Sequence, residues 1–444
     1  MRGSENPTTR TLLVGLDGAD WEVLLPLLDD GKLPNLARLV EGGTIGKCIA
    51  TGSRDQSDLW TSVATGTLRD KHGIVAGVEP KLDGRGLVRA SSLTRQRRAV
   101  WSVLAGNGSR CQITGWPASG VAERLEGGVV VSDEFWGSPG DSFEHWRLGA
   151  GAIHPERLRR NLAELRVHPK EIGMADLVPL VPRLGELLQA GDRRALGLAQ
   201  TLALVSSTHA AATAVMQKEP WDFAAVWYGG IGETTRGFGD FHGGGAPWAD
   251  VGDVEAYGGV VEGMYRFHDL MLGVLMELAG EETAVVVVSG QGEPAGEARA
   301  LPGKTMRGDK NYGLFVMAGP GIKGDELVYG TSVLDLVPTV LHYCGLPVGA
   351  DLPGKVLVEA LEEPGEVATV PSWEEIDGDF GEHPGWKCRD PLVQVVMRKR
   401  GIVMGVIGRG SDVAEQVEEV TVELAFQRAK AALDAGRLDE AVGM

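Results

Sequence analysis

The chain has 444 residues, 43% of them hydrophobic, so it can bury a large core divided over about two or three structural units. Its formal charge of -18, from 61 acidic and 43 basic residues, disfavours a polyanionic partner such as a nucleic acid or an anionic membrane surface. The sequence shows no signal peptide, no apolar run of the roughly 18 residues that span a bilayer and no paired cysteines, so we expect a cytoplasmic protein without a disulfide framework.

Short apolar runs alternate with helical periodicity along the chain, which predicts a parallel α/β sheet. Residues 11–20 form a strand that ends in an aspartate-bearing turn. The leucines of 21–31 and of 33–43 then recur at helical spacing. Further strands are predicted at 111–116, 127–133, 222–228, 283–289 and 312–319.

The pattern changes in three places, and these changes suggest domain boundaries. Residues 150–220 are helical and indicate a cap inserted between sheet strands. After about residue 360 the chain is acidic and rich in Gly and Pro, whereas its last segment returns to helix formers around a Gly break. We therefore expect a core of residues 1–77 and 221–360, a mixed insertion at 78–220 with its helical cap at 150–220, a linker or surface excursion at 361–393, and a helical tail at 394–444.

Several polar groups have both a functional and a structural interpretation. Asp17 stands at the end of the first strand, where a carboxylate can hold a metal or accept a hydroxyl proton, but it can equally be the N-cap of the helix at 21. The hydroxyl-rich run 58–74 can expose a nucleophile, although helix capping is commoner. His268 and Asp269 lie within a helical stripe, which favours packing or capping over metal binding.

The glycine-rich stretch 229–245 contains Glu233, Arg236, Asp240 and His242. It has no P-loop, and its GFGDFHG spacing is only weakly similar to a dinucleotide-binding fingerprint. The sequence contains neither a nucleophile elbow nor an HExxH zinc helix.

A set of collinear segments identifies a possible family: GLDGADW (15–21), LPNLARLVEGGTIG (33–46), WTSVATGTLRDKHGI (60–74), AVWSVLAGNGSRCQITGWPAS (99–119), YRFHDLMLGVLMELAG (265–280), AGPGIKGDELVYGTSVLDLVPTVLHYCGLPVGADLPGKVL (318–357) and VPSWEEIDGD (370–379). With these segments the chain resembles the alkaline phosphatase superfamily over nearly all of 11–444. The most similar branch is the type I phosphodiesterase and nucleotide pyrophosphatase group, in particular bacterial members with tetratricopeptide repeats behind the catalytic domain.

The resemblance implies a fold and a chemistry. The fold is a central, mostly parallel sheet flanked by helices, with an inserted helical cap and, in this chain, a C-terminal helical hairpin. The chemistry is phosphoryl or phosphodiester transfer by two metals, typically zinc, with a Thr or Ser nucleophile. Two cations that clamp the attacking and leaving oxygens need about six Asp and His ligands from several strand ends.

The family's site residues correspond to an unusual set in this chain. Asp17 matches the first metal-binding aspartate, but the nucleophile position falls on Gln56. The family's Asp-x-x-x-His pair falls on Gly232 and Arg236, its Asp-His pair on Gly290 and Gln291, and its last His ligand on Asp309. The vestigial pocket implied by the resemblance therefore consists of Asp17, Gln56, Ser57, Glu233, Arg236, Gln291 and Asp309.

Two carboxylates cannot hold a pair of zinc ions, so we expect no metal, no cofactor and no catalytic residue. A guanidinium fixed beside a divalent ion in a partly desolvated pocket would cost on the order of several kcal/mol. We hypothesise instead that Arg236 replaces a metal by pairing with Asp17 or Asp309. This requires its guanidinium to lie within about 6 Å of one of the two carboxylates.

A one-residue shift of the correspondence would place Ser57 at the nucleophile position and Glu233 at the lost aspartate, but it would not restore Gly290 and Gln291. Three functions therefore stay open. The first is a pseudoenzyme that acts as a scaffold, assembly or binding protein. The second is a phosphodiesterase or phosphohydrolase that uses Ser57, Asp17 and a single divalent metal such as zinc. The third is a metal-free sensor of a small anion held by Arg236 and the glycine amides of 229–232.

The tail VELAFQRAKAALDAGRLDEAV resembles one tetratricopeptide unit. A lone repeat cannot bury its apolar faces, so we expect it to dock on the core, on a second copy of the chain or on another protein. The expected partner is therefore a protein, or a second copy, bound through the cap or the C-terminal helices.

Overall fold

The computed structural model of the chain describes residues 10–50, 55–80, 87–140, 143–300 and 312–381, together with 429–430 and 437. Its strands are β1 (Arg10–Leu16), β2 (Thr44–Ile49), β3 (Val78–Pro80), β4 (Leu87–Arg89), β5 (Cys111–Thr114), β6 (Val129–Val131), β7 (Ile153–His154), β8 (Phe223–Tyr228), β9 (Thr283–Val288), β10 (Tyr312–Ala318), β11 (Glu326–Val328), β12 (Val348–Gly349) and β13 (Thr369–Val370). Its helices are α1 (Trp21–Asp29), α2 (Pro34–Glu41), α3 (Gln56–Thr65), α4 (Arg69–His72), α5 (Val100–Gly106), α6 (Arg159–Ala163), α7 (Met174–Leu177), α8 (Leu184–Gln189), α9 (Leu196–Lys218), α10 (Gly230–Phe238), α11 (Val251–Tyr257), α12 (Val260–Ala279) and α13 (Leu336–Tyr343).

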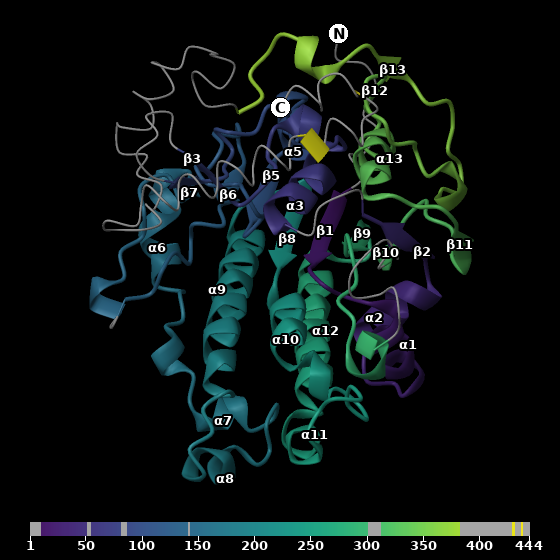
Figure 1. The fold of residues 1–444 in the computed structure, drawn as a ribbon. Coiled ribbons are helices and arrows are strands. Elements are labelled where there is room, and N and C mark those ends of the chain that lie inside the picture. The colour runs from purple at the N-terminus through teal and green to yellow at the C-terminus, as the bar shows by residue number, and fades with distance from the viewer. Residues whose placement is uncertain are drawn as a thin grey trace.

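The largest sheet of the described residues has nine strands in the order β11-β2-β10-β9-β1-β8-β5-β6-β7 (Figure 1). The central strands β9, β1, β8, β5 and β6 are parallel. Strand β10 is antiparallel to both of its neighbours, β9 and β2. The predicted mostly parallel α/β sheet is therefore confirmed. Because parallel strands end at the same edge, the turns after β1, β8 and β9 meet there, where ligands bind in sheets of this kind.

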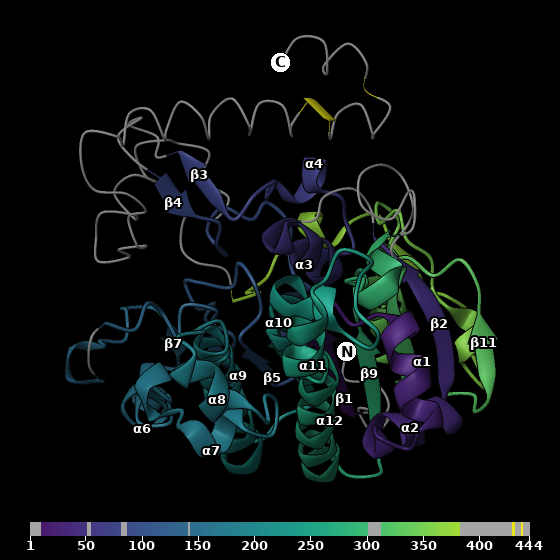
Figure 2. The same cartoon turned by 60° about the horizontal axis from the view of Figure 1, so that its bottom comes forward.

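Alternate residues of β1 enter two separate cores. Leu12 and Val14 pack with residues of α1, α2, α9, α10 and α12 on one face of the sheet. Leu13 packs with residues of α3, α5 and α13 on the other face, and Figure 2 shows helices on both sides. Burial on both faces explains why the central strands are continuous apolar runs, such as the fully buried TAVVVV of β9.

The predicted strands are all present, as β1, β5, β6, β8, β9 and β10. Strand β2 was not predicted. Its sequence TIGKCI has no continuous apolar run, because the strand alternates between buried and less buried positions with Lys47 exposed in its middle.

The helices predicted for 150–220 are α6 to α9, which lie in the chain between β7 and β8 (Figure 1). The segment 78–220 also contributes β5, β6 and β7 to the central sheet, so it belongs to the core as well as to the cap. The domain boundaries themselves stay a prediction.

The acidic segment after residue 360 packs on the core in its described part. Trp373 and Phe380 are 8% and 3% exposed and belong to the same buried cluster as α5. The guanidinium of Arg98 lies 3.7 Å from the centre of the Phe380 ring. Residues 361–381 are therefore a docked excursion rather than a free linker.

Two aspartates from different parts of the chain cap neighbouring helices. The side chain of Asp20 accepts a hydrogen bond from the backbone of Glu22 and caps α1, so the interpretation of Asp17 as this cap is wrong. Helix α2 has no cap of its own, and Asp269 of α12 takes this role by accepting the backbone N–H groups of Asn35 and Leu36 at 3.2 and 2.8 Å.

Of the tail 394–444, the structure describes residues 429, 430 and 437. Arg437 forms an ion pair of 2.9 Å with Asp70 of α4. The predicted hairpin and tetratricopeptide-like unit otherwise lie outside the described residues. Within the described ranges, no helix is both long and apolar enough to cross a membrane.

Candidate functional site

Asp17 lies at the carboxyl edge of the central sheet, in the turn that follows β1. Its backbone N–H donates to the carbonyl of Tyr228 at the end of β8, at 2.9 Å. The next residue, Gly18, forms a β-bridge with Gly292 in the turn after β9. These contacts join the turns of three adjacent strands, and so they gather the positions that correspond to Asp17, Gly232 and Gly290.

Both carboxylate oxygens of Asp17 accept hydrogen bonds from helix α3. The indole nitrogen of Trp60 donates to Oδ1 at 3.0 Å, and the amide of Gln56 donates to Oδ2 at 2.7 Å. Helix α3 begins directly after its N-cap Asp55, which places Gln56 in the first turn. The residue at the predicted nucleophile position therefore binds the carboxylate through its amide and offers no nucleophilic atom.

Arg236 of α10 brings a positive charge to the same carboxylate. Its Nη1 lies 3.7 Å from Oδ2 of Asp17 and 3.7 Å from Glu293, and its Nη2 lies 3.1 Å from Glu233. The distance to Asp17 is within the limit of about 6 Å that the pairing hypothesis requires. Asp309 lies outside the described residues. The Arg236 side chain is 40% exposed and that of Asp17 only 5%, so the guanidinium reaches inward from the surface.

Burial and neighbouring charges shift the pKa values of Asp17 and Arg236 in opposite directions. Burial raises the pKa of Asp17, although the hydrogen bonds from Trp60 and Gln56 and the charge of Arg236 partly oppose this rise. Burial alone would lower the pKa of Arg236, but the carboxylates of Glu233, Asp17 and Glu293 outweigh it and raise that pKa. Arg236 is therefore a permanent cation, and it compensates part of the unfavourable burial of Asp17.

Gly232 leaves no room for a metal-binding side chain at its position. A Cβ there would lie 2.5 Å from Oδ2 of Asp17 and 3.2 Å from Nη1 of Arg236. The Gly232 amide donates to the backbone carbonyl of Asp17 at 2.8 Å. On the other side, Gly18 has a positive φ of 77°, and a Cβ on it would lie 2.5 Å from Cα of Gly232. Helix α10 thus touches the turn after β1 through backbone atoms.

The turn after β9 is equally closed to a metal ligand. A Cβ on Gly290 would lie 2.7 Å from a methyl carbon of Leu59, so this leucine of α3 fills the space beside it. Gln291 is half-buried, and its backbone carbonyl accepts a hydrogen bond from Ser289 at 2.9 Å. A neutral amide is a weak metal ligand, and glycine provides none.

The described residues at these positions do not fit a pair of divalent metals. Asp17 is the only carboxylate among them, whereas a single zinc site commonly needs about four ligands. Arg236 adds a repulsive charge. In the part of the chain that the structure describes, no group of three or more His, Cys, Asp or Glu side chains is arranged to hold a metal. Because Asp309 lies outside that part, metal-free function stays a prediction.

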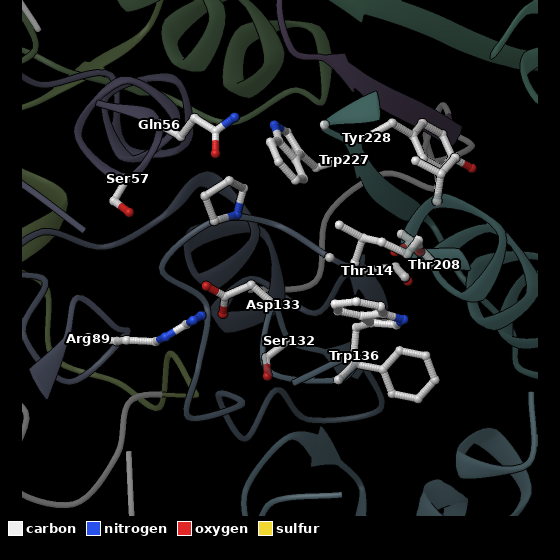
Figure 3. A pocket seen from close by; sticks show the side chains of 16 residues that line it. Gln56, Ser57, Arg89, Thr114, Ser132, Asp133, Trp136, Thr208, Trp227 and Tyr228 are labelled. Carbon is white, nitrogen blue, oxygen red and sulfur yellow. The ribbon is translucent and has the colours of Figure 1, made fainter. Parts of the chain in front are cut away.

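A cavity of about 240 Å³ lies beside Gln56 and Ser57 (Figure 3). It is bordered by the start of α3, the ends of β5, β6 and β8, and the cap helix α9. Ser57, the neighbour of the predicted nucleophile position, lines this cavity, whereas Glu233 is exposed on α10 and pairs with Arg236. Of the two residues that a one-residue shift would bring into the site, Ser57 therefore lines the cavity and Glu233 does not.

The hydroxyl run 58–74 is neither a helix cap nor an exposed nucleophile. Ser62 is buried and hydrogen-bonded to His72 at 3.0 Å, and Thr65 donates to the carbonyl of Thr61 at 2.8 Å. The expectation of packing and capping for His268 and Asp269 is confirmed, since both are buried and Asp269 caps α2.

Trp60 and Glu293 belong to the site but were not predicted. Trp60 lies within an apolar helical stripe, which is typical of a core residue, and only its position one helical turn after Gln56 connects it to the site. Glu293 follows the turn after β9, and the strand-end rule that identified Asp17 extends to it.

The chain is similar to one protein family and to several solved structures. The profile of the type I phosphodiesterase / nucleotide pyrophosphatase family matches residues 11–299. A 2-O GAG sulfatase structure is similar with a TM-score of 0.52 and 12% identity, covering 82% of this chain and 76% of that chain. Human ectonucleotide pyrophosphatase / phosphodiesterase 5 aligns with a TM-score of 0.44 and 11% identity, covering 80% of this chain and 100% of that chain. No curated protein is significantly similar in sequence. The likeness to the sulfatase concerns the fold alone.

Proposed function

Because the chain belongs to the type I phosphodiesterase / nucleotide pyrophosphatase family, we propose that it is a non-catalytic member that works as a binding, assembly or scaffold protein. The observation that carries this proposal is the set of partners of Asp17. Trp60 and Gln56 donate to its two oxygens, and Arg236 lies 3.7 Å away. In a catalytic member, the resemblance implies a metal and a hydroxyl nucleophile at this place.

The substitutions around Asp17 are mutually consistent, which supports the proposal. Loss of a metal alone would leave a buried carboxylate without a counter-charge, which is strongly destabilising. Gln56 and Arg236 supply a donor and a cation to that carboxylate, and Gly232, which has no side chain, leaves space for the carboxylate and for Arg236. The residues that replace the family's nucleophile and metal ligands therefore also stabilise the site in the absence of a metal.

The anion-sensor alternative fits the site less well. Three carboxylates, from Asp17, Glu233 and Glu293, surround the guanidinium of Arg236 and would repel an anion. The amide of Gly232 already donates to the carbonyl of Asp17. Neither the charge nor this amide is available to a phosphate-like ligand.

The cap offers a surface for the expected protein contact. Met174, Val178 and Leu196 are large apolar side chains that are 46%, 41% and 41% exposed. We expect light scattering of the full chain to show concentration-dependent self-association. Replacing Met174 and Val178 by Ser should weaken that association, and an unchanged association would remove the cap from the proposal.

The decisive experiment measures metal content and hydrolysis together. The purified full chain is analysed for zinc and manganese and then assayed on bis(p-nitrophenyl) phosphate with either metal added. We expect less than stoichiometric metal and the same background rate for the wild type and for Asp17→Asn. Stoichiometric metal, together with turnover that Asp17→Asn abolishes, would refute the non-catalytic role.

The same assay tests the alternative phosphodiesterase that uses Ser57. Ser57 lines the cavity, so a residual nucleophile at this position is the most direct competitor of the proposal. Turnover that is lost in Ser57→Ala but kept in Ser138→Ala, an exposed control serine, would establish that alternative.

A further inference from the structure

The cavity beside Gln56 has a polar and an apolar side. Figure 3 shows Arg89 and Asp133 on the side of Ser57, and Trp136 with a second aromatic ring on the opposite side. The volume of about 240 Å³ is below the roughly 300–1,000 Å³ of sites for drug-sized ligands. A ligand of this cavity is therefore a small amphipathic molecule.

Asp133 is held in place by the loop that faces it. The backbone N–H groups of Ala118 and Gly120 donate to its two oxygens at 2.9 and 2.7 Å. The Ser119 hydroxyl also donates to Oδ1, at 3.4 Å, so it is Oδ2 that keeps a second lone pair that can accept a bond from the cavity. Ala118 has a φ of 58°, a left-handed conformation that is unfavourable for a residue with a Cβ. Such strain is concentrated at functional sites, where it fixes a side chain in advance.

Arg89 and Asp133 both border the cavity, and the positive charge of Arg89 acts on Asp133, but among the described residues no ion pair joins their side chains. Figure 3 shows the guanidinium and the carboxylate directed towards the same space. Two opposite charges that share a space without direct contact can each bind the complementary charge of one ligand. The polar side of the cavity is therefore suited to a group that carries both a cation and an anion.

The apolar side is rigid. Trp136 packs edge-to-face on Trp146 with ring centroids 5.6 Å apart, and its indole nitrogen donates to the carbonyl of Val167 at 3.4 Å. Phe135 and Leu204 complete this side, next to helix α9. Preformed aromatic walls of this kind bind an apolar group at low entropic cost.

We propose that this cavity binds a small zwitterion with an apolar or aromatic side group, the chemistry of a free α-amino acid. The ligand's ammonium group bonds to Asp133, its carboxylate bonds to Arg89, and its side group lies between Trp136 and the cap helix. Asp133 would repel a phosphate or other simple anion, and Arg89 would repel a simple cation. Each of these ligands would therefore make only half of the favourable contacts. This inference goes beyond the proposed function and does not depend on whether the Asp17 site is catalytic.

The test is calorimetry on the full chain with whole and half ligands. The probes are L-phenylalanine and L-leucine, 2-phenylethylamine, which lacks the carboxylate, and 3-phenylpropionate, which lacks the amine. We expect at least one amino acid to bind with a Kd below about 1 mM and both half ligands to bind at least about tenfold more weakly. No binding of either amino acid, or equal binding of a half ligand, would overturn the proposal.

Variants assign the two charges. Arg89→Gln should reduce affinity for the amino acid at least about tenfold but should not weaken binding of 2-phenylethylamine, because it removes a like charge, whereas Asp133→Asn should weaken both. Arg89 is exposed, so its variant stays informative even if Asp133→Asn fails to fold. Arg160→Gln, on the exposed face of α6, is the control and should bind as the wild type does. Unchanged affinity in Arg89→Gln would contradict the assignment. A negative binding result would not change the metal and hydrolysis results. The ligand proposal and the proposed function can therefore be refuted independently of each other.

Discussion

Trp60 and Trp227 pack edge-to-face with ring centroids 6.0 Å apart, yet only one of their indole nitrogens has a hydrogen-bond partner among the described residues. Trp60 donates to Asp17, whereas the buried nitrogen of Trp227 has no acceptor there. Comparing variants of the two tryptophans therefore tests whether the carboxylate depends on its indole donor.

We expect Trp60→Phe to destabilise the protein by about 1–3 kcal/mol more than Trp227→Phe, because it leaves a buried carboxylate short of one donor. Both variants lose the same ring atoms, but Trp60 is fully buried and Trp227 only half-buried, so the difference combines the hydrogen bond with a larger packing loss at Trp60. Urea denaturation checks this, and equal losses in the two variants would show that Asp17 does not rely on the indole.

Two glycines of α10 test separately how steric contact and helix propensity affect the stability of the protein. Gly232→Ala places a methyl 2.5 Å from Oδ2 of Asp17, and we expect it to destabilise the protein by about 1–3 kcal/mol. Gly237→Ala meets nothing within 4 Å and should stabilise by about 0.5–1 kcal/mol through helix propensity. Thermal unfolding should therefore shift in opposite directions for the two variants, and a shift in the same direction would contradict the tight contact at Gly232.

Glu134 should make stability depend on pH near neutrality. Burial, together with the adjacent Asp133, raises its pKa to about 7 from 4.5. The folded state then binds the proton more tightly than the unfolded state, so stability falls as the pH rises from 4.5 through about 7. Glu134→Gln removes this charge and should stabilise by about 1–3 kcal/mol at pH 8, with little effect at pH 5.

The control for this prediction is Glu126→Gln, at an exposed position. Its effect should be the same at both values of pH. If Glu134→Gln showed no greater benefit at pH 8 than at pH 5, the raised pKa of Glu134 would be wrong.

Phe380 tests whether the acidic segment is docked. We expect Phe380→Ala to cost about 3–5 kcal/mol, because the ring is 3% exposed and contacts α5 and Arg98. Tyr329→Ala removes an aromatic ring that is 80% exposed and should cost little. Limited proteolysis should cleave the Phe380→Ala variant near residue 365 faster than the wild type. Equal cleavage rates in the variant and the wild type would argue against docking of the segment.

The sheet was predictable because its central strands are buried on both faces and so form continuous apolar runs, as in β9. The alternating strand β2 carries no such run and needs its partners β10 and β11 to define it. Asp17 was predictable as a strand-end carboxylate, but its role was not decided by sequence alone, since a capping residue would occupy the same kind of position.

The cavity could not be assembled from the sequence. Arg89 ends strand β4, whereas Ala118 and Asp133 lie in the loops after β5 and β6, and only the fold brings them together. Asp133 nevertheless follows β6 as Asp17 follows β1, so the same strand-end rule would have selected it. Arg89 offers no comparable signal, because an isolated surface arginine at the end of a short strand is usually solvated.

The capping of α2 by Asp269 has a consequence for the order of folding. Helix α2 has no N-cap side chain of its own, and the group that supplies one is 233 residues further along the chain. A contact of such long range can form only after most of the chain has left the ribosome. In nascent chains that end before α12, the helix of residues 34–41 should therefore be unstable. The first half of the fold becomes stable only after the second half has been synthesised.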